Sequence, residues 1–296
     1  MRVLLTTDGS KESIAAMRAA SRLLSSEDRK VDVLYVAPEL RSPKSGNIAR
    51  RSMEDRVAAE TRRILGEAKG ILAEEGIDAL TLSESGSPAN VIMHDAEDYD
   101  ITVIGAKGRD ARSAAGLGPV ASRLVEHASG CVLVGREPPG DRGMRMLVPV
   151  DGSAGSVQAL DTLSSFFDLE SAEITLLHVQ ETLWLPYEPP AEQSRESPDP
   201  DASQNNQLSR ELRLEAEELL AESRIRVLEH HPGVTTSIRE GNPANEILSE
   251  ADQGDYDLVV VGAGGASEMK HSILGSVSTK VAWNAPCSVL VVRVQE

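Results

Sequence analysis

The stretch Leu147–Ser153 reads LVPVDGS, and 143 residues earlier Leu4–Ser10 reads LLTTDGS. At the same spacing, Val31–Val36 (VDVLYV) matches Ile174–Val179 (ITLLHV). Each pair combines a short apolar run with a polar turn at the same place. A similarity of this kind at a fixed spacing indicates that the chain contains two copies of one domain.

The match continues towards the end of the chain. Gly86–Asn90 (GSPAN) corresponds to Gly241–Asn245 (GNPAN) at a spacing of 155, and from Asp98 against Asp255 onwards the spacing is 157. The spacing grows because the second copy has extra residues after its second expected strand. The sequence therefore predicts that the second copy contains inserted residues and that these leave the repeated strands and motifs in the same order.

We predict a first domain over residues 1–137 and a second over residues 144–296, joined by a short connector that contains Pro and Gly. The extra residues of the second copy fall within 181–207. That segment is rich in Pro, Ser, Asn and Gln, a composition that resists regular structure. We predict a mobile loop there.

Within each copy, short β-branched runs alternate with longer stretches of helical period. In the first copy the expected strands are Val3–Thr7, Val31–Val36, Ala79–Ser83, Ile101–Gly105 and Val132–Val134. Strands that are apolar on both faces and separated by helices predict an α/β fold. We expect two tandem doubly wound, Rossmann-like domains, each with a five-stranded parallel sheet flanked by helices.

The longest expected helices carry an apolar face. In the first copy it runs from Met53 to Leu72, and in the second from Leu208 to Val227. Both faces are expected to pack on the sheet. In such domains a ligand binds at the carboxyl ends of the strands, where the strand order reverses.

Composition limits the function classes. The chain has 296 residues, of which 40% are hydrophobic and 26% charged, an ordinary balance for a globular protein. Its formal charge of −17 repels phosphate backbones and anionic membranes, so we expect neither nucleic acid nor membrane as a partner. With two cysteines, Cys131 and Cys287, and no apparent secretion signal, we expect a cytoplasmic protein with buried thiols.

A glycine string follows the fourth expected strand of the second copy. Gly262 and Gly265 are followed, after nine residues, by Gly275 and Ser276. Glycines allow backbone amides to approach an anion, and a helix that begins near Ser276 offers unpaired amides and the positive end of its dipole. The string suits a phosphate chain. The alternative is that the glycines only form a tight strand exit and that Ser276 caps a helix.

This string resembles the nucleotide-binding signature of the universal stress protein family, and nearly the whole chain resembles the tandem two-domain members. The resemblance implies an ATP site with Mg²⁺ or Mn²⁺. It implies that Asp151 contacts adenosine, that Val179 meets adenine, and that Val277 joins Ser276 near the phosphates. Pro149 also resembles the family's version of its segment. The resemblance further implies pairing of the copies through their last strands, within one chain or in a homodimer.

The first copy keeps the glycine spacing and changes the chemistry. Gly105, Gly108 and Gly118 are in register, but Pro119 stands where the second copy has Ser276. Proline fits the first position of a helix. It nevertheless lacks the N–H and the hydroxyl that a phosphate would use.

Positive charge lies close to the same loop of the first copy. Lys107, Arg109 and Arg112 could compensate for the missing donors, and Asp8 and Val36 correspond to the adenosine contacts of the second copy. Whether the first copy binds ATP is left open by the sequence.

The leading hypothesis is an ATP-binding universal stress protein, a nucleotide-dependent regulator or interaction protein in stress response. No nucleophile or general base accompanies the glycine string, so we expect no enzyme, although slow hydrolysis of ATP is compatible with the site. Three alternatives remain: a nucleotide-free tandem scaffold, an adenylyl-transferring enzyme, and a site for another adenine ligand such as a cyclic nucleotide.

Overall fold

The structure is a computed structural model. It describes residues 1–24, 29–39, 47–109, 116–137, 143–167, 169, 172–181, 200–228, 233–264 and 274–293. The first half contains the elements β1 (Arg2–Thr6), α1 (Lys11–Leu23), β2 (Lys30–Ala37), α2 (Asn47–Glu74), β3 (Ala79–Ser85), α3 (Pro88–Asp95), η1 (Ala96–Asp98), β4 (Ile101–Gly105), α4 (Pro119–His127) and β5 (Cys131–Gly135). The second half contains β6 (Arg145–Pro149), α5 (Ala154–Phe166), β7 (Glu173–Gln180), α6 (Pro200–Leu228), β8 (Val234–Glu240), α7 (Pro243–Gln253), β9 (Leu258–Gly262), α8 (Ser276–Asn284) and β10 (Ser288–Val292).

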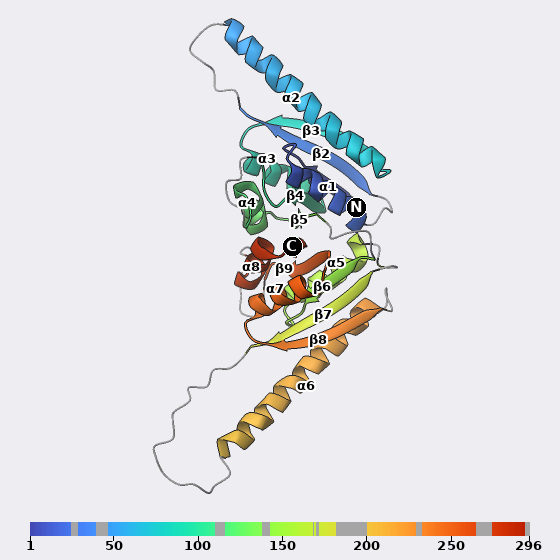
Figure 1. Ribbon diagram of the computed structural model, residues 1–296, viewed down its shortest axis with the longest axis vertical. Helices are drawn as coiled ribbons and strands as arrows, with labels where there is room; N and C mark the ends of the chain where they lie inside the picture. Colours follow the sequence, from blue (N-terminus) through green and yellow to red (C-terminus); the bar gives the residue numbers. More distant parts are fainter. Residues whose placement is uncertain are drawn as a thin grey trace, which may run out of the picture.

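The ten strands form one sheet in the order β3-β2-β1-β4-β5-β10-β9-β6-β7-β8 (Figure 1). Within each half all pairings are parallel, and the order reverses between β1 and β4 and between β6 and β9. The predicted α/β fold is confirmed. All five strands expected in the first copy are present, with ends that differ by at most two residues.

The repeated DGS segment explains how each half starts. After the first strand, Gly9 and Gly152 adopt positive φ values of 71° and 77°, which a residue with a side chain rarely adopts. The next residue caps the following helix: the hydroxyls of Ser10 and Ser153 accept hydrogen bonds from amides three residues further on, at 3.1 and 3.2 Å. The segment thus ends a strand, turns the chain and starts a helix.

Two apolar layers cover the sheet, and each continues through both halves. One contains buried side chains of α1, α2, α5 and α6, such as Met17, Ile64, Leu163 and Leu220. The other contains buried side chains of α3, α4, α7 and α8, such as Ile92, Leu124, Ile247 and Val281. Burial of apolar surface on both faces of one sheet therefore stabilises the two halves together.

The halves meet where β5 pairs antiparallel with β10. Arg136 of the first half donates to the carbonyls of Cys287 (2.9 Å) and Ala282 (2.8 Å), and Arg293 of the second half donates to Val125 (2.6 Å). Ala282 and Val125 lie near the C-terminal ends of α8 and α4, where a positive charge is favourable. Each half therefore supplies an arginine to the other, and the pairing through last strands occurs within one chain.

The long helices differ from the expectation at their starts. Met53 is 51% exposed and Leu208 is 38% exposed, although both were predicted to face the core. Figure 1 shows the reason: the beginnings of α2 and α6 extend past the edge of the sheet, so the periodic pattern outruns the surface that it could cover.

The prediction of a loop over residues 181–207 is wrong for its last eight residues. From Pro200 they belong to α6, because proline fits a first helical turn and residues 201–228 contain neither Gly nor Pro. Residues 182–199 lie outside the described part of the chain.

Two further observations concern the expected environment. Among the helices described, none combines the length and apolarity needed to cross a bilayer. Cys131 and Cys287 are buried free thiols, as expected. Burial raises the pKa of Cys287 to about 12.

Candidate functional site

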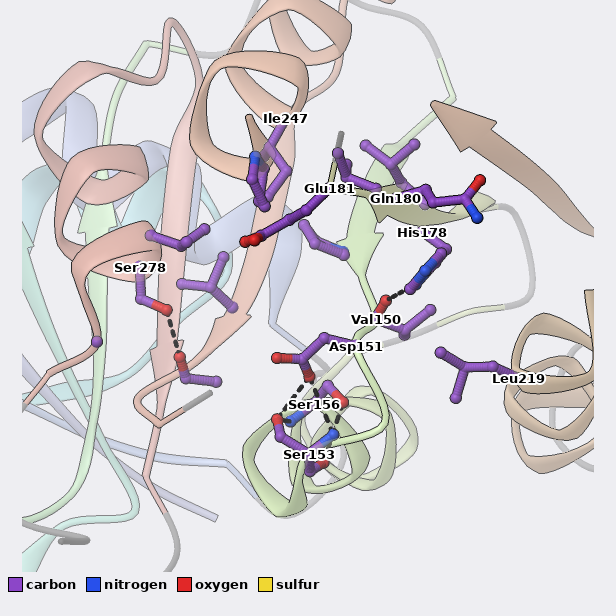
Figure 2. A pocket seen from close by; sticks show the side chains of 18 of the residues that line it. Val150, Asp151, Ser153, Ser156, His178, Gln180, Glu181, Leu219, Ile247 and Ser278 are labelled. Carbon is purple, nitrogen blue, oxygen red and sulfur yellow. Dashed lines mark hydrogen bonds between the residues drawn. The ribbon is translucent and has the colours of Figure 1, made fainter. Parts of the chain in front are cut away.

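A cavity of about 720 Å³ opens in the second half. It lies at the carboxyl ends of β6, β7 and β9, where the strand order reverses, and α6, α7 and α8 also contribute to its wall (Figure 2). Its lining includes Pro149, Asp151, Val179, Gly262, Gly264, Gly275, Ser276, Val277 and Ser278. The volume and place are those of a small-molecule site in a doubly wound fold.

The start of α8 forms one end of the cavity. Gly275 precedes the helix in an extended conformation, and the amides of the first helical turn have no partner within the helix. The Ser278 hydroxyl donates to the Gly262 carbonyl at 2.6 Å and so ties the helix start to the end of β9 (Figure 2). Backbone donors are thereby held at the cavity wall, which suits an anion.

The other end lies beside β6 and β7. The Asp151 carboxylate accepts hydrogen bonds from the amide (3.0 Å) and the hydroxyl (2.6 Å) of Ser153. His178 Nδ1 lies 2.9 Å from the Val150 carbonyl. Figure 2 shows the Asp151 carboxylate beside Ser153 and the His178 ring beside Val150. Val179, the next residue of β7, completes this wall.

The charge of the lining is acidic. Asp151, Glu181 and Glu215 line the cavity, and its described lining contains neither lysine nor arginine. A phosphate bound here would depend on amides and hydroxyls for its hydrogen bonds. A divalent cation would offset the repulsion between phosphate and carboxylates.

Gly262 also has a packing role. A Cβ at this position would collide with the backbone of Gly155 at the start of α5. The glycine is therefore required by the close approach of β9 to α5, in agreement with the strand-exit interpretation of the string. A Cβ at Gly264, in contrast, would meet no atom of the described residues within 4 Å.

In the first half, the equivalent residues also lie together. Asp8 accepts hydrogen bonds from the amides of Ser10 and Arg109, both at 2.9 Å. Burial favours the neutral acid, but the hydrogen bonds from Ser10 and the Arg109 amide prevail and lower the pKa of Asp8. A Cβ at Gly108 would lie 2.7 Å from Asp8 Oδ2, so the loop and the aspartate are in contact.

The remaining predicted residues of the first half keep their structural places. Gly105 packs on the backbone of Glu12, the Gly118 amide donates to the Ala106 carbonyl at 2.8 Å, and Val36 is half-buried at the end of β2. Pro119 is the first residue of α4, so the helix forms without the serine.

Arg109 was one of three residues whose positive charge could compensate for the missing donors. In the structure its Nη1 donates to Glu60 Oε1 of α2 at 2.9 Å. The ion pair forms because α2 passes over the same loop. Arg112 lies outside the described residues.

The model of the universal stress protein family matches residues 1–136 and again residues 144–293. The chain belongs to this family. A universal stress protein of Mycolicibacterium smegmatis is 27% identical over 308 residues, which cover 98% of this chain and 96% of the relative. The crystal structure of a universal stress protein from Archaeoglobus fulgidus covers 100% of this chain and 98% of its own, with a TM-score of 0.65 and 19% identity. Another solved universal stress protein, in complex with cAMP, covers 52% of this chain and 98% of its own, with 22% identity and a TM-score of 0.34.

Seven of the eight residues predicted for the site of this universal stress protein's second half line the cavity: Pro149, Asp151, Val179, Gly262, Gly275, Ser276 and Val277. Gly265 lies outside the described residues. Sequence reasoning missed the wall made by α6, whose Leu212, Glu215 and Leu219 line the cavity. The apolar spacing of Leu212 and Leu219 was visible in the sequence, but it did not reveal that the helix passes over the strand ends.

Proposed function

We propose that the second half binds ATP together with Mg²⁺ or Mn²⁺ and that the chain acts in stress response as a nucleotide-dependent regulator or interaction protein. The observation that carries this proposal is the start of α8, whose first amides have no partner within the helix and which borders the cavity together with Ser276. A helix start of this kind binds phosphate without a lysine or arginine. This matters in a lining that is otherwise acidic.

The cation would arrive with the nucleotide. Among the described residues, no group of three His, Cys, Asp or Glu side chains is arranged to hold a metal ion. Phosphate oxygens and water would therefore supply most of its ligands. Bound to the phosphates, the cation would reduce their repulsion from the carboxylates of the lining.

The hydroxyls at the cavity position the backbone. Ser153 donates to Asp151 and Ser278 donates to Gly262, while His178 faces the Val150 carbonyl. The Ser153 hydroxyl that donates to Asp151 also accepts from the Ser156 amide at 3.2 Å and so serves as the cap of α5. This favours a binding protein over an enzyme.

Calorimetric titration with ATP and MgCl₂ tests the proposal. We expect one ATP per chain. The substitution Val179→Trp should abolish binding by filling the cavity, whereas Val36→Trp, at the equivalent position of the first half, should leave it intact. Absence of binding at millimolar ATP, or unchanged affinity in the Val179 variant, would overturn the proposal. Tighter binding of cAMP, or release of AMP and pyrophosphate with an acceptor, would replace it with one of the alternatives.

A further inference from the structure

Arg109 covers the turn that follows β1. A Cβ at Gly9 would lie 2.5 Å from Arg109 Nη2 and 3.1 Å from the Ile64 side chain. The guanidinium is therefore in contact with Gly9, beside the carboxylate of Asp8. This is the turn that, in the second half, borders the cavity.

The same side chain reaches α2. Nη1 donates to Glu60 at 2.9 Å, and the backbone amide of Arg109 donates to Asp8 at 2.9 Å. Arg109 thus bridges the end of β1 and the helix above it. Glu60 also binds Arg63 at 2.9 Å, so Glu60 keeps a cationic partner when Arg109 is removed.

The repeat identifies the corresponding residues of the second half. Asp8 corresponds to Asp151 at the spacing of 143, and Glu60 and Ile64 correspond to Glu215 and Leu219 at the spacing of 155. The spacing of α2 and α6 is supported by contacts, because Ile64 lies against Gly9 as Leu219 lies against Gly152. Asp151, Glu215 and Leu219 all line the cavity. The guanidinium of Arg109 consequently lies over the part of the first half that corresponds to this section of the cavity lining.

The residue that corresponds to Arg109 in the second half is Ala266, at the spacing of 157. Ala266 lies outside the described residues, but alanine has no guanidinium with which to form the ion pair that Arg109 makes. Besides Pro119 against Ser276, the two copies therefore differ in sequence at the residue that covers the turn of the first half.

We propose that the first half contains a second adenine-nucleotide site that its own Arg109 keeps closed. This inference rests on the proposed function of the second half. The guanidinium occupies the place of the ligand and binds the same wall, so a nucleotide can enter only when Arg109 leaves Glu60. The chain then binds one nucleotide although it contains two copies of the fold.

The test uses the full chain and three variants. Arg109→Ala installs the residue found at position 266, and Arg109→Ala combined with Pro119→Ser also restores the helix start. Arg63→Ala removes the other cation bound to Glu60 and is the control for charge. Native mass spectrometry and calorimetry with ATP and MgCl₂ give the stoichiometry, and circular dichroism checks that each variant folds.

We expect one ATP in the wild type and in the Arg63 variant, and two in the double variant. Arg109→Ala alone should open the site with about tenfold weaker binding than in the double variant, because Pro119 lacks two donors. A double variant that folds and binds one ATP, like the wild type, would overturn the inference. If the wild type binds none, the proposed function fails; binding of one ATP by the double variant would then still support the closed site, and binding of none would refute it as well.

Discussion

Helices α4 and α8 both begin one residue after a glycine in extended conformation, with φ and ψ of −71° and 165° at Gly118 and −61° and 152° at Gly275. In both, the glycine amide donates to a carbonyl of the preceding loop, at 2.8 and 2.7 Å. The first helical residue is Pro119 in one half and Ser276 in the other. The comparison shows that the backbone at the start of this helix is kept when the groups that a phosphate would bind are lost.

The largest expected effect is on the free energy of unfolding, and it distinguishes the packing role of two glycines from a role in binding ATP. Gly262→Val and Gly105→Val each place a branched side chain against backbone, of Gly155 and Glu12 respectively. Overpacking of this kind should lower the free energy of unfolding by about 3 kcal/mol in either variant, measured by urea denaturation. Only the Gly262 variant should also lose ATP binding. Normal ATP affinity in that variant would contradict the assignment of the cavity.

A substitution with an intermediate expected effect makes the second half resemble the first. Ser276→Pro should leave the fold intact, because α4 already begins with proline. It removes one N–H and one hydroxyl from the cavity wall, so ATP should bind about tenfold more weakly, as expected for roughly 1 to 2 kcal/mol. Calorimetry gives the Kd, and Ser276→Ala, which keeps the amide, should lie between. Equal affinities of all three proteins would show that the helix start does not hold the ligand.

The smallest effect concerns the ion pairs of Glu60 with Arg63 and Arg109. Hydrogen bonds from Arg63 and then Arg109 lower the pKa of Glu60 from 4.5 to about 2. Since this pKa is lower in the folded chain, the contribution to stability is complete above about pH 4.5 and is lost as the pH falls towards 2. The contribution is small because the carboxylate is exposed to solvent.

Thermal unfolding of the wild type and of Glu60→Gln from pH 2 to 8 measures this contribution. The difference in Tm should be constant between pH 5 and 8 and disappear towards pH 2. A difference that changes between pH 5 and 8 would mean that another group controls the contact. A constant difference would mean that the ion pairs of Glu60 persist over this pH range.

Much of the fold follows from local pattern. The DGS segments predict a turn and a helix start because glycine and serine act within a few residues, and the strands follow from short apolar runs. The length over which the sheet covers α2 does not follow from local pattern. Periodicity shows which face of the helix is apolar, but the exposure of Met53 depends on where the sheet ends.

The candidate site also has a part that local sequence predicts and a part that depends on the fold. Ser276 and the glycines were found because their chemistry is contained in one segment. The partner of Arg109 was not predicted, because Glu60 lies 49 residues earlier in the chain. The long arginine side chain also has several acceptors within reach of its loop. The α6 wall escaped for a similar reason, since a helix face acquires its neighbours only through the fold.

The antiparallel contact between β5 and β10 has a consequence for how the two copies can change. In an assembly of two identical chains, a replacement such as proline at the helix start would alter both sites at once, and assembly would depend on concentration. Here the partner half is attached to the same chain and is present at a high effective concentration at any expression level. One copy is thus free to lose the groups that would hold a ligand while it continues to complete the sheet of the other.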